Sequence, residues 1–169
     1  DYPGFPGVKE TGRSSRENAA SKAPAACRYC DVRAFADDSG LEVEALDGRP
    51  GIYSSRYAAT DSERIAKLLG ELKGVENRRA RFACAIAIAV NGEVIETFEG
   101  EVRGTIVDAP RGEDGFGYDP VFQPDGYDKT FGEMPQELKN RISHRAAAFK
   151  LALEFVEDEM SVLDDDFDL

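Results

Sequence analysis

The sequence predicts an α/β fold in which an elongated mixed sheet is flanked by helices. Two segments indicate strands: residues 32–40 place the apolar Val32, Ala34, Phe35 and Ala36 ahead of two carboxylates, and residues 81–90 alternate large apolar side chains with alanines. A third segment indicates a helix, because Thr60 and Glu63 form a capping box ahead of an apolar stripe at residues 61–73. Strands and amphipathic helices in one chain favour a sheet covered by helices.

The composition indicates one globular domain. The chain has 169 residues, of which 41% are hydrophobic and 32% charged, and it has no apolar run long enough to cross a membrane. The net charge of -12 argues against nonspecific nucleic-acid binding, which depends on basic surfaces. We therefore expect no membrane or nucleic-acid partner, a domain over residues 1–160, and a solvated acidic tail at residues 161–169. Partner binding by the tail is the alternative.

The cysteines favour a reducing compartment. Their number, 3, is odd, which is typical of free thiols in a cytoplasmic protein. Cys27 and Cys30 have the spacing of half a zinc or redox site, but the sequence offers no second pair to complete it. A metal or redox role for this pair is therefore not favoured.

The segment from Val32 to Gly40 is the first candidate for a functional site. Ser39 and Gly40 are turn residues, so we expect the strand to end there and to present Asp37 and Asp38 to a cleft. Successive strand side chains point to opposite faces, so at most one of these carboxylates can face a given pocket. The alternative is that both only form hydrogen bonds within a turn.

A loop and a helix are expected before this strand. Residues 1–11 are rich in Pro and Gly, and Ser14 opens a capping-box signature for a helix at residues 17–28. Pro24 lies inside this helix and should bend it or end it early.

A second strand, a helix and a buried strand should follow. Residues 41–45 alternate apolar and acidic side chains, which predicts a strand with one wet face. The helix at residues 61–73 should end at Gly74, and the strand at residues 81–90 should be covered on both faces.

The last part of the chain should hold a hairpin and one helix. Asn91-Gly92 predicts a turn into a return strand at residues 93–99, residues 102–107 suggest a further strand, and residues 109–120 form a glycine-rich loop. One helix should begin near Pro135. We expect its apolar stripe to pack on the body through Ile142, Ala146, Phe149, Leu153, Val156 and Met160.

Four motifs together resemble the inosine triphosphate pyrophosphatase family, also called dITP/XTP pyrophosphatases. In chain order they are Ala36 to Gly40, Gly48-x-Pro50-Gly51-x-Tyr53-Ser54-x-Arg56-Tyr57, Phe116-Gly117-Tyr118-Asp119-Pro120, and Lys139 to Ser143-His144-Arg145. Each motif alone is weakly specific, but the resemblance runs from about Tyr2 to Val156. It implies two lobes around a nucleotide cleft, a homodimer, and Mg2+-dependent hydrolysis of non-standard purine nucleoside triphosphates (dITP, ITP, XTP) to monophosphate and pyrophosphate.

The resemblance also implies which residues act on the phosphates. Asp38 matches the proton acceptor and metal-associated carboxylate, with Asp37 as its supporting neighbour. Glu10 matches a second metal-site carboxylate, Lys22 a phosphate-facing lysine, and Ser39 a substrate contact. These residue types suit Mg2+, which prefers oxygen ligands and usually takes one or two carboxylates together with substrate phosphates. Without the resemblance, Glu10 would be interpreted as an exposed loop acid.

Later residues are implied in base recognition. The substrate-binding residues carried over are Phe116, Gly117, Tyr118, Asp119, Lys139, His144 and Arg145, with the Phe116 ring stacked on the purine. Donors from His144 or Arg145 would suit the oxygen at position 6 of hypoxanthine or xanthine and leave the amine of adenine facing another donor. Taken singly, the phenylalanine could anchor the loop and the histidine could lie on a helix surface. We expect Asp38, Phe116 and Arg145 to surround one cleft.

One part of the family pattern is missing from the sequence. Family members open with a strand and a Thr-Gly-Asn-x-x-Lys loop that binds the triphosphate, and neither is found before Glu10. The sequence therefore predicts an N-terminally incomplete member with impaired activity. The alternatives are an inactive nucleotide-binding protein, or a structural module that acts through its acidic tail.

Overall fold

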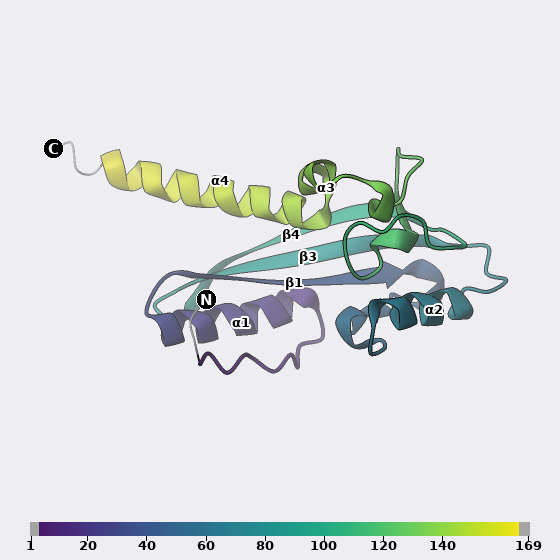
Figure 1. The fold of residues 1–169 in the computed structure, drawn as a ribbon. Coiled ribbons are helices and arrows are strands. Elements are labelled where there is room, and N and C mark those ends of the chain that lie inside the picture. The colour runs from purple at the N-terminus through teal and green to yellow at the C-terminus, as the bar shows by residue number, and fades with distance from the viewer. Residues whose placement is uncertain (1–3, 166–169) are drawn as a thin grey trace.

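The computed structural model describes residues 4–165 and contains one elongated sheet in the strand order β2-β1-β3-β4-β5. Helices α4 and α1 run along opposite faces of this sheet, and α2 lies toward its other end (Figure 1). The strands are β1 (Ala34–Val43), β2 (Pro50–Gly51), β3 (Arg79–Val90), β4 (Glu93–Ile106) and β5 (Phe122–Pro124). The helices are α1 (Ser15–Cys30), α2 (Asp61–Glu71), α3 (Gln136–Ile142) and α4 (His144–Asp165).

The expected α/β class with a helix-flanked sheet is confirmed, but its mixed character is not. Every strand pairing among the described residues is antiparallel. The largest core cluster packs aromatic residues of the sheet and the following loops, such as Phe82, Phe122 and Phe131, with Leu68 of α2 and Leu72 at the C-terminal end of that helix. This cluster supports the end of the sheet next to the candidate site.

Strand β1 is longer than expected because it does not stop at Ser39 and Gly40. It continues to Val43, so the predicted turn and separate strand at residues 41–45 are one element. Gly40 serves a close approach instead of a turn, since a Cβ at this position would collide with the backbone carbonyl of Gly51 on β2. Asp37 and Asp38 therefore lie in the middle of a strand.

The predicted hairpin between β3 and β4 is confirmed. Asn91 and Gly92 have φ values of 53° and 80°, as the two central residues of a type I′ turn require. The return strand is a single β4 that runs to Ile106, so the separate strand expected at residues 102–107 does not exist. Near this turn, the register of the β3–β4 pairing shifts between Ile88 and Ala89.

Helix α1 begins at its predicted cap and continues past Pro24. The Ser14 side chain accepts a hydrogen bond from the Glu17 N–H, and the helix continues to Cys30. Ala19 and Ala23 are fully buried against alanines of β3. This close packing offsets the backbone hydrogen bond that proline cannot make, so the expected early end of the helix is wrong.

The last helical segment differs from the expected single helix with one apolar stripe. It breaks at Ser143, whose Oγ accepts a hydrogen bond from the Ala146 N–H at the start of α4. Among the side chains described on α4, Ala148 and Ala152 are fully buried. Of the predicted contacts, Ile142 and Val156 pack partly buried against the core as expected, whereas Phe149 and Leu153 are 50% and 45% exposed. Gly100 on β4 explains this, because a Cβ there would collide with the backbone of α4, and only small residues fit so close a contact.

The expected acidic tail lies only partly within the described residues. Helix α4 continues to Asp165, while residues 166–169 of the expected acidic tail, like the Met160 side chain, lie outside what is described.

Over residues 4–165 no helix combines the length and apolarity that a membrane span requires. All three cysteines are free thiols, and the Cys27 sulfur accepts a hydrogen bond from the Gly92 N–H.

Candidate active site

Strand alternation places the two central carboxylates of β1 on opposite faces of the sheet. Asp38 pairs with Ala85 and faces α1, whereas Asp37 pairs with Ile86 and faces α4. The expectation that at most one of them can face a given pocket is therefore confirmed. Each carboxylate belongs to a separate group of side chains, described in turn below.

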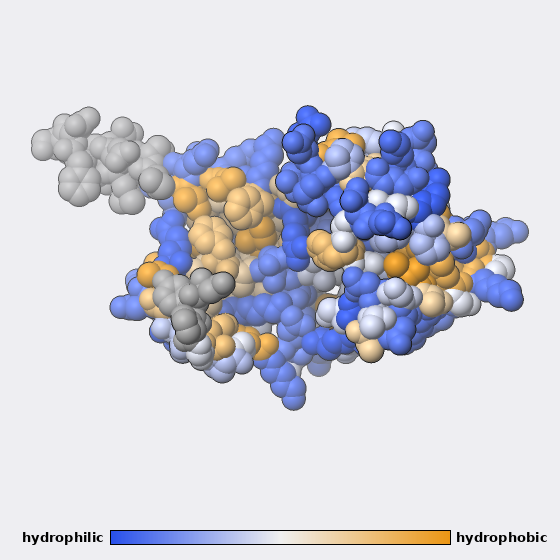
Figure 2. Space-filling model, in the orientation of Figure 1, coloured by the Kyte–Doolittle hydropathy of each residue, from blue (hydrophilic) through white to orange (hydrophobic). Residues whose placement is uncertain are grey.

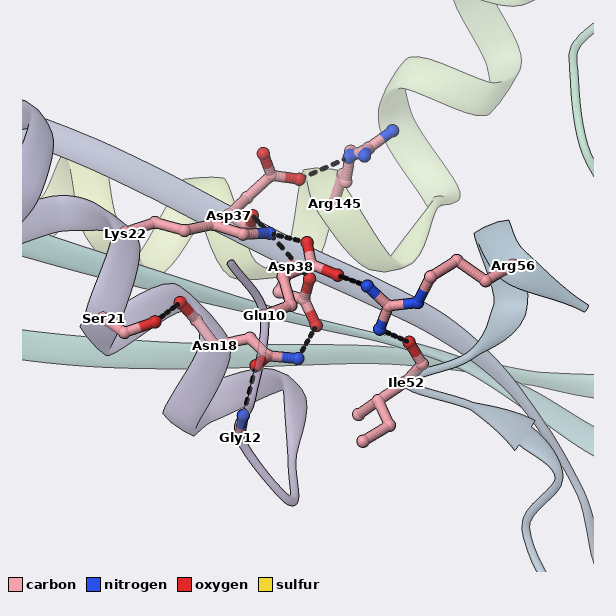
Figure 3. A network of polar contacts seen from close by, with 10 residues as sticks. All are labelled: Glu10, Gly12, Asn18, Ser21, Lys22, Asp37, Asp38, Ile52, Arg56 and Arg145. Carbon is pink, nitrogen blue, oxygen red and sulfur yellow. Dashed lines mark hydrogen bonds and ion pairs between the residues drawn. The ribbon is translucent and has the colours of Figure 1, made fainter. Parts of the chain in front are cut away.

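The first group is a network of charges around Asp38 (Figure 3). The Lys22 ammonium on α1 lies 2.8 Å from Asp38 Oδ1 and 2.6 Å from Glu10 Oε1, so one cation joins both carboxylates. Asp38 is buried, with 8% of its side chain exposed. The three residues that the family resemblance assigned to the metal and phosphates are thus brought together.

Two members of this network were missed by the sequence analysis. Asn18 is fully buried, donates from Nδ2 to Asp38 over 3.4 Å, and accepts a hydrogen bond from the Gly12 N–H. Arg56 donates to Glu10 Oε2 over 2.9 Å. Asn18 precedes Lys22 by four residues, the spacing that places two side chains on one helix face, so this signal was present in the sequence. Arg56 lies in a quoted motif, but its type gave no reason to pair it with Glu10.

The charges of this network stabilise one another. The hydrogen bond from Lys22 holds the pKa of Glu10 below its usual range, and the positive charge of Arg56 adds to the effect. Burial alone would lower the pKa of Lys22, but its hydrogen bonds to Asp38 and Glu10 outweigh burial and raise it. At neutral pH, Lys22 is therefore a fixed cation and Glu10 a fixed anion.

The donor set fits Mg2+. Glu10 and Asp38 both approach a single nitrogen, so both can reach one cation, and all of their donor atoms are oxygens. Over residues 4–165 there is no group of three or more His, Cys, Asp or Glu side chains that could hold a metal ion. Such a site suits a metal that takes one or two carboxylates and completes its coordination with water and substrate phosphates.

The second group lines a cavity of about 470 Å³ on the α4 face, between β1 and the segment from α3 into α4. This volume lies in the range of small-molecule sites. Its charged and aromatic lining includes Asp37, Phe116, Asp119, Lys139, His144 and Arg145. Phe35 and Phe149, which are each about half exposed, continue the lining. Figure 2 shows an apolar area on the surface below α4.

A buried ion pair forms one wall of the cavity. Lys139 and Asp119 are only 5% and 9% exposed, and Lys139 Nζ lies 3.5 Å from Asp119 Oδ2. Burial raises the pKa of Asp119, although the N–H of Phe116 and the lysine charge oppose the rise. The loop can approach this pair because residue 115 is glycine. A Cβ on Gly115 would collide with the carboxylate and lie 2.6 Å from the lysine nitrogen.

His144 is held as a neutral ring at the start of α4. It stacks on Phe82 with ring centroids 4.9 Å apart, and burial, with the nearby charge of Arg145, lowers its pKa to about 4. Its Nδ1 is buried without a hydrogen-bond partner among the described residues. A neutral imidazole offers one N–H donor and one acceptor, so His144 can join a neutral base by hydrogen bonds without adding charge.

Several predicted site residues do not line this cavity. Gly117 donates its N–H to Asp61, and Tyr118 is buried with its hydroxyl donated to the Ser54 carbonyl, so both hold the loop in place. Ser39 faces the α4 side opposite Cys84, and its Oγ is buried without a partner in the described part of the chain.

The expectation of one cleft around Asp38, Phe116 and Arg145 requires correction. Phe116 and Arg145 share the cavity, but the strand residue that lines it is Asp37, and Asp38 faces the other side of β1. The outer edge of β1 separates the two groups, and β2 pairs only with Leu41 and Glu42 at its far end.

The fold and these two groups define a class of α/β protein, in which one long sheet carries a carboxylate and lysine network on one face and a nucleotide-sized cavity on the other. Within that class, this chain belongs to the Ham1 family, whose model matches residues 1–155. The family resemblance carried by the four motifs is thereby confirmed.

Curated relatives and solved structures agree with this assignment. Relatives from Bacillus subtilis and Geobacillus kaustophilus, both named dITP/XTP pyrophosphatase, are 49% and 52% identical over 148 and 153 residues. These alignments cover 85% and 88% of this chain and 75% of each relative. The Staphylococcus aureus Ham1 protein superposes with a TM-score of 0.85 at 46% identity, covering 90% of this chain and 81% of that one. A HAM1 protein from Coxiella burnetii gives 0.86 at 40% identity, covering 91% and 82%.

Proposed function

We propose that this protein is a nucleoside triphosphate pyrophosphatase that hydrolyses dITP, XTP and ITP to the monophosphate and pyrophosphate, and so cleanses the nucleotide pool. The observation that carries the proposal is the contact of one lysine with two acidic side chains: Lys22 holds Glu10 and Asp38 together beside a strand whose other face borders a purine-sized cavity. Relatives about half identical to this chain carry the name of this activity.

The substrate would lie across the free edge of β1. Its purine would enter the cavity on the α4 face, and its phosphates would reach the network around Asp38 on the α1 face. The half of β1 that carries both carboxylates has no strand on its outer side within residues 4–165. A nucleotide can therefore contact both faces at this point.

The phosphate side supplies charge and a proton acceptor. Lys22 is cationic and can offset the charge that develops on the leaving pyrophosphate, while the Asp38 carboxylate can orient a water molecule and accept its proton. Arg56, now bonded to Glu10, is a second cation within the network. Glu10 and Asp38 are the ligands we propose for Mg2+, which when bound would supply further positive charge against the triphosphate.

The cavity can favour purines with an oxygen at position 6 over adenine. Lys139 and Arg145 are cationic donors at its wall and mouth, and neutral His144 can add one more donor. The oxygen at position 6 of hypoxanthine or xanthine accepts such hydrogen bonds. The amine of adenine would leave a buried donor facing another donor, which costs about 1–3 kcal/mol. The exposed ring of Phe116 is placed to stack on the base at the mouth of the cavity.

Pyrophosphate release tests this proposal directly. The purified chain is assayed with Mg2+ against dITP, XTP, ITP, dATP and dGTP, next to Asp38→Asn and an exposed control, Asp128→Asn. We expect turnover of the first three substrates, its loss in Asp38→Asn, and no change in the control. Saturable dITP binding without turnover in the parent would show that the protein binds nucleotides and is not an enzyme. The magnesium requirement, a homodimeric state and a cytoplasmic location remain predictions.

A further inference from the structure

The pair between Asp37 and Arg145 joins β1 to the first turn of α4 at the mouth of the cavity. Arg145 Nε lies 2.8 Å from Asp37 Oδ2. Both residues line the cavity, and the guanidinium carbon lies 5.6 Å from the centre of the Phe116 ring. The family resemblance had given Asp37 a different task, the support of its neighbour Asp38.

The geometry gives the Asp37 carboxylate a different partner, while the backbone carbonyl of Asp37 accepts a hydrogen bond from Lys22. The two side chains leave β1 on opposite faces, and the Asp38 carboxylate has its own partners in Lys22 and Asn18. The Asp37 carboxylate instead meets Arg145, across the sheet from this network (Figure 3). Among residues 4–165, Asp37 is the hydrogen-bond partner that holds the Arg145 side chain.

The way in which Arg145 is held leaves it ready for a ligand. Only Nε is used by Asp37, and in Figure 3 the terminal nitrogens extend away from the carboxylate. A second acid–arginine pair offers a contrast, because Arg81 gives Nε and a terminal nitrogen to Glu42 and its other terminal nitrogen to Glu101. All three guanidinium nitrogens of Arg81 have a partner, whereas the two terminal nitrogens of Arg145 have no hydrogen-bond partner among residues 4–165 and lie at a cavity.

We propose that Asp37 is a positioning residue that fixes the Arg145 guanidinium at the cavity mouth, so that its terminal nitrogens meet the purine nucleotide. The side chain of Arg145 is 48% exposed, and a free arginine loses rotamer entropy when it is immobilised. Asp37 lies in a strand paired on β3, so it supplies a rigid anchor before the ligand arrives. The ligand in this inference rests on the proposed function.

The consequence is a selective loss of affinity when Asp37 is changed. Asp37→Asn keeps the shape of the side chain but removes the charge that holds Nε. We expect KM for dITP and Kd for dIMP to rise about 5- to 20-fold while kcat stays within about twofold. Asp37→Glu should recover most of the affinity. In an Arg145→Met background, Asp37→Asn should cause no further loss, since the residue acts through Arg145.

Glu42→Gln is the matched control. It lies on the same strand, removes one acid of a comparably exposed arginine pair, and does not line the cavity. Its KM should equal that of the parent, and its melting temperature and that of Asp37→Asn should agree within about 2 °C, because exposed pairs contribute little to stability. A fall in kcat at constant KM would show that Asp37 supports Asp38 instead of positioning Arg145. A fall in KM would show that Asp37 competes with the substrate for Arg145, and an unchanged KM would also overturn the proposal.

A measurement without substrate separates this inference from the proposed function. In a 1H–15N spectrum, the Arg145 Nε–H signal should be protected from solvent exchange in the parent and in Glu42→Gln, and lost in Asp37→Asn. If the parent neither binds nor hydrolyses dITP, the proposed function fails, and this signal still decides whether Asp37 holds Arg145. A signal unchanged in Asp37→Asn would refute the positioning role.

Discussion

Replacing Lys22 by methionine tests the network that joins Glu10 and Asp38. The substitution keeps the length of the side chain and removes the ammonium that lies 2.6 Å and 2.8 Å from the two carboxylates. Glu10 would keep its contact with Arg56. Asp38, whose side chain is 8% exposed, would lose the ammonium and keep the long hydrogen bond of 3.4 Å from Asn18.

The expected cost follows from this burial. Removing one partner of a fully buried ion pair costs about 3–5 kcal/mol, because the remaining charge is left without a partner. Here the side chains of Lys22 and Glu10 are 24% and 21% exposed, so water screens part of the loss. We expect the free energy of unfolding to fall by about 1–3 kcal/mol, and the melting temperature by about 3–10 °C.

The pKa shifts determine at which pH values the stability of Lys22→Met should differ most from that of the parent. The pKa of Glu10 is lowered in the folded protein, so its contribution to stability is present above pH 4.5 and is lost as the pH falls through the folded value. The pKa of Lys22 is raised, so its contribution persists up to its usual value of 10.5 and is lost above it. The gap between parent and Lys22→Met should therefore be widest between these limits and close on the acid side.

The assay is urea unfolding at several pH values, with and without Mg2+. Lys150→Met is the control, since this lysine is 77% exposed and lies 3.8 Å from Glu154, and it should match the parent within about 0.5 kcal/mol. Mg2+ should stabilise Lys22→Met more than the parent, because no ammonium then stands between the carboxylates. If Lys22→Met is as stable as the control at pH 7, or gains nothing from Mg2+, the reasoning about this network is refuted.

Three further predictions concern glycines and a histidine. Gly115→Ala should displace the buried ion pair and weaken dITP binding at least about tenfold. Gly126→Ala is the control, because Gly126 has a similar positive φ and open space around it, and it should leave binding unchanged. Titration calorimetry measures both affinities. Gly40→Ala should lower the free energy of unfolding by about 2–4 kcal/mol because it forces β1 from β2, while Gly70→Ala on α2 should raise it by about 0.5–1 kcal/mol; equal urea midpoints would contradict this. The pKa of His144 is lowered from 6.5 to about 4, so between these pH values the folded state binds fewer protons than the unfolded state. The free energy of unfolding should therefore fall by about 2–3 kcal/mol as the pH drops from 6.5 to about 4. Urea unfolding of His144→Gln should not show this dependence on pH.

Local signals in the sequence identified the elements whose ends depend on nearby residues. The caps at Ser14 and Thr60 and the turn at Asn91-Gly92 act through hydrogen bonds or backbone angles within a few residues, and all three are found as predicted. The four motifs likewise identify the family from sequence alone. The resemblance also groups Lys22, Glu10 and Asp38, which the structure brings together.

Contacts between distant parts of the chain decided the rest. Gly40 appears in the sequence as a turn residue, but the backbone of Gly51 needs the space that a side chain would fill, so β1 runs on. The helix pattern favoured large residues for the buried face of α4, yet Gly100 brings the helix so near that only Ala148 and Ala152 fit.

The division of labour between Asp37 and Asp38 combines both sources. Strand alternation requires them to face apart, and the sequence alone is enough to establish this. Which carboxylate meets Lys22 and which meets Arg145 depends on the faces that α1 and α4 cover, and those helices are far apart in the chain. Packing of helices on a sheet is a long-range choice, and so only the tertiary structure assigns each carboxylate to its partner.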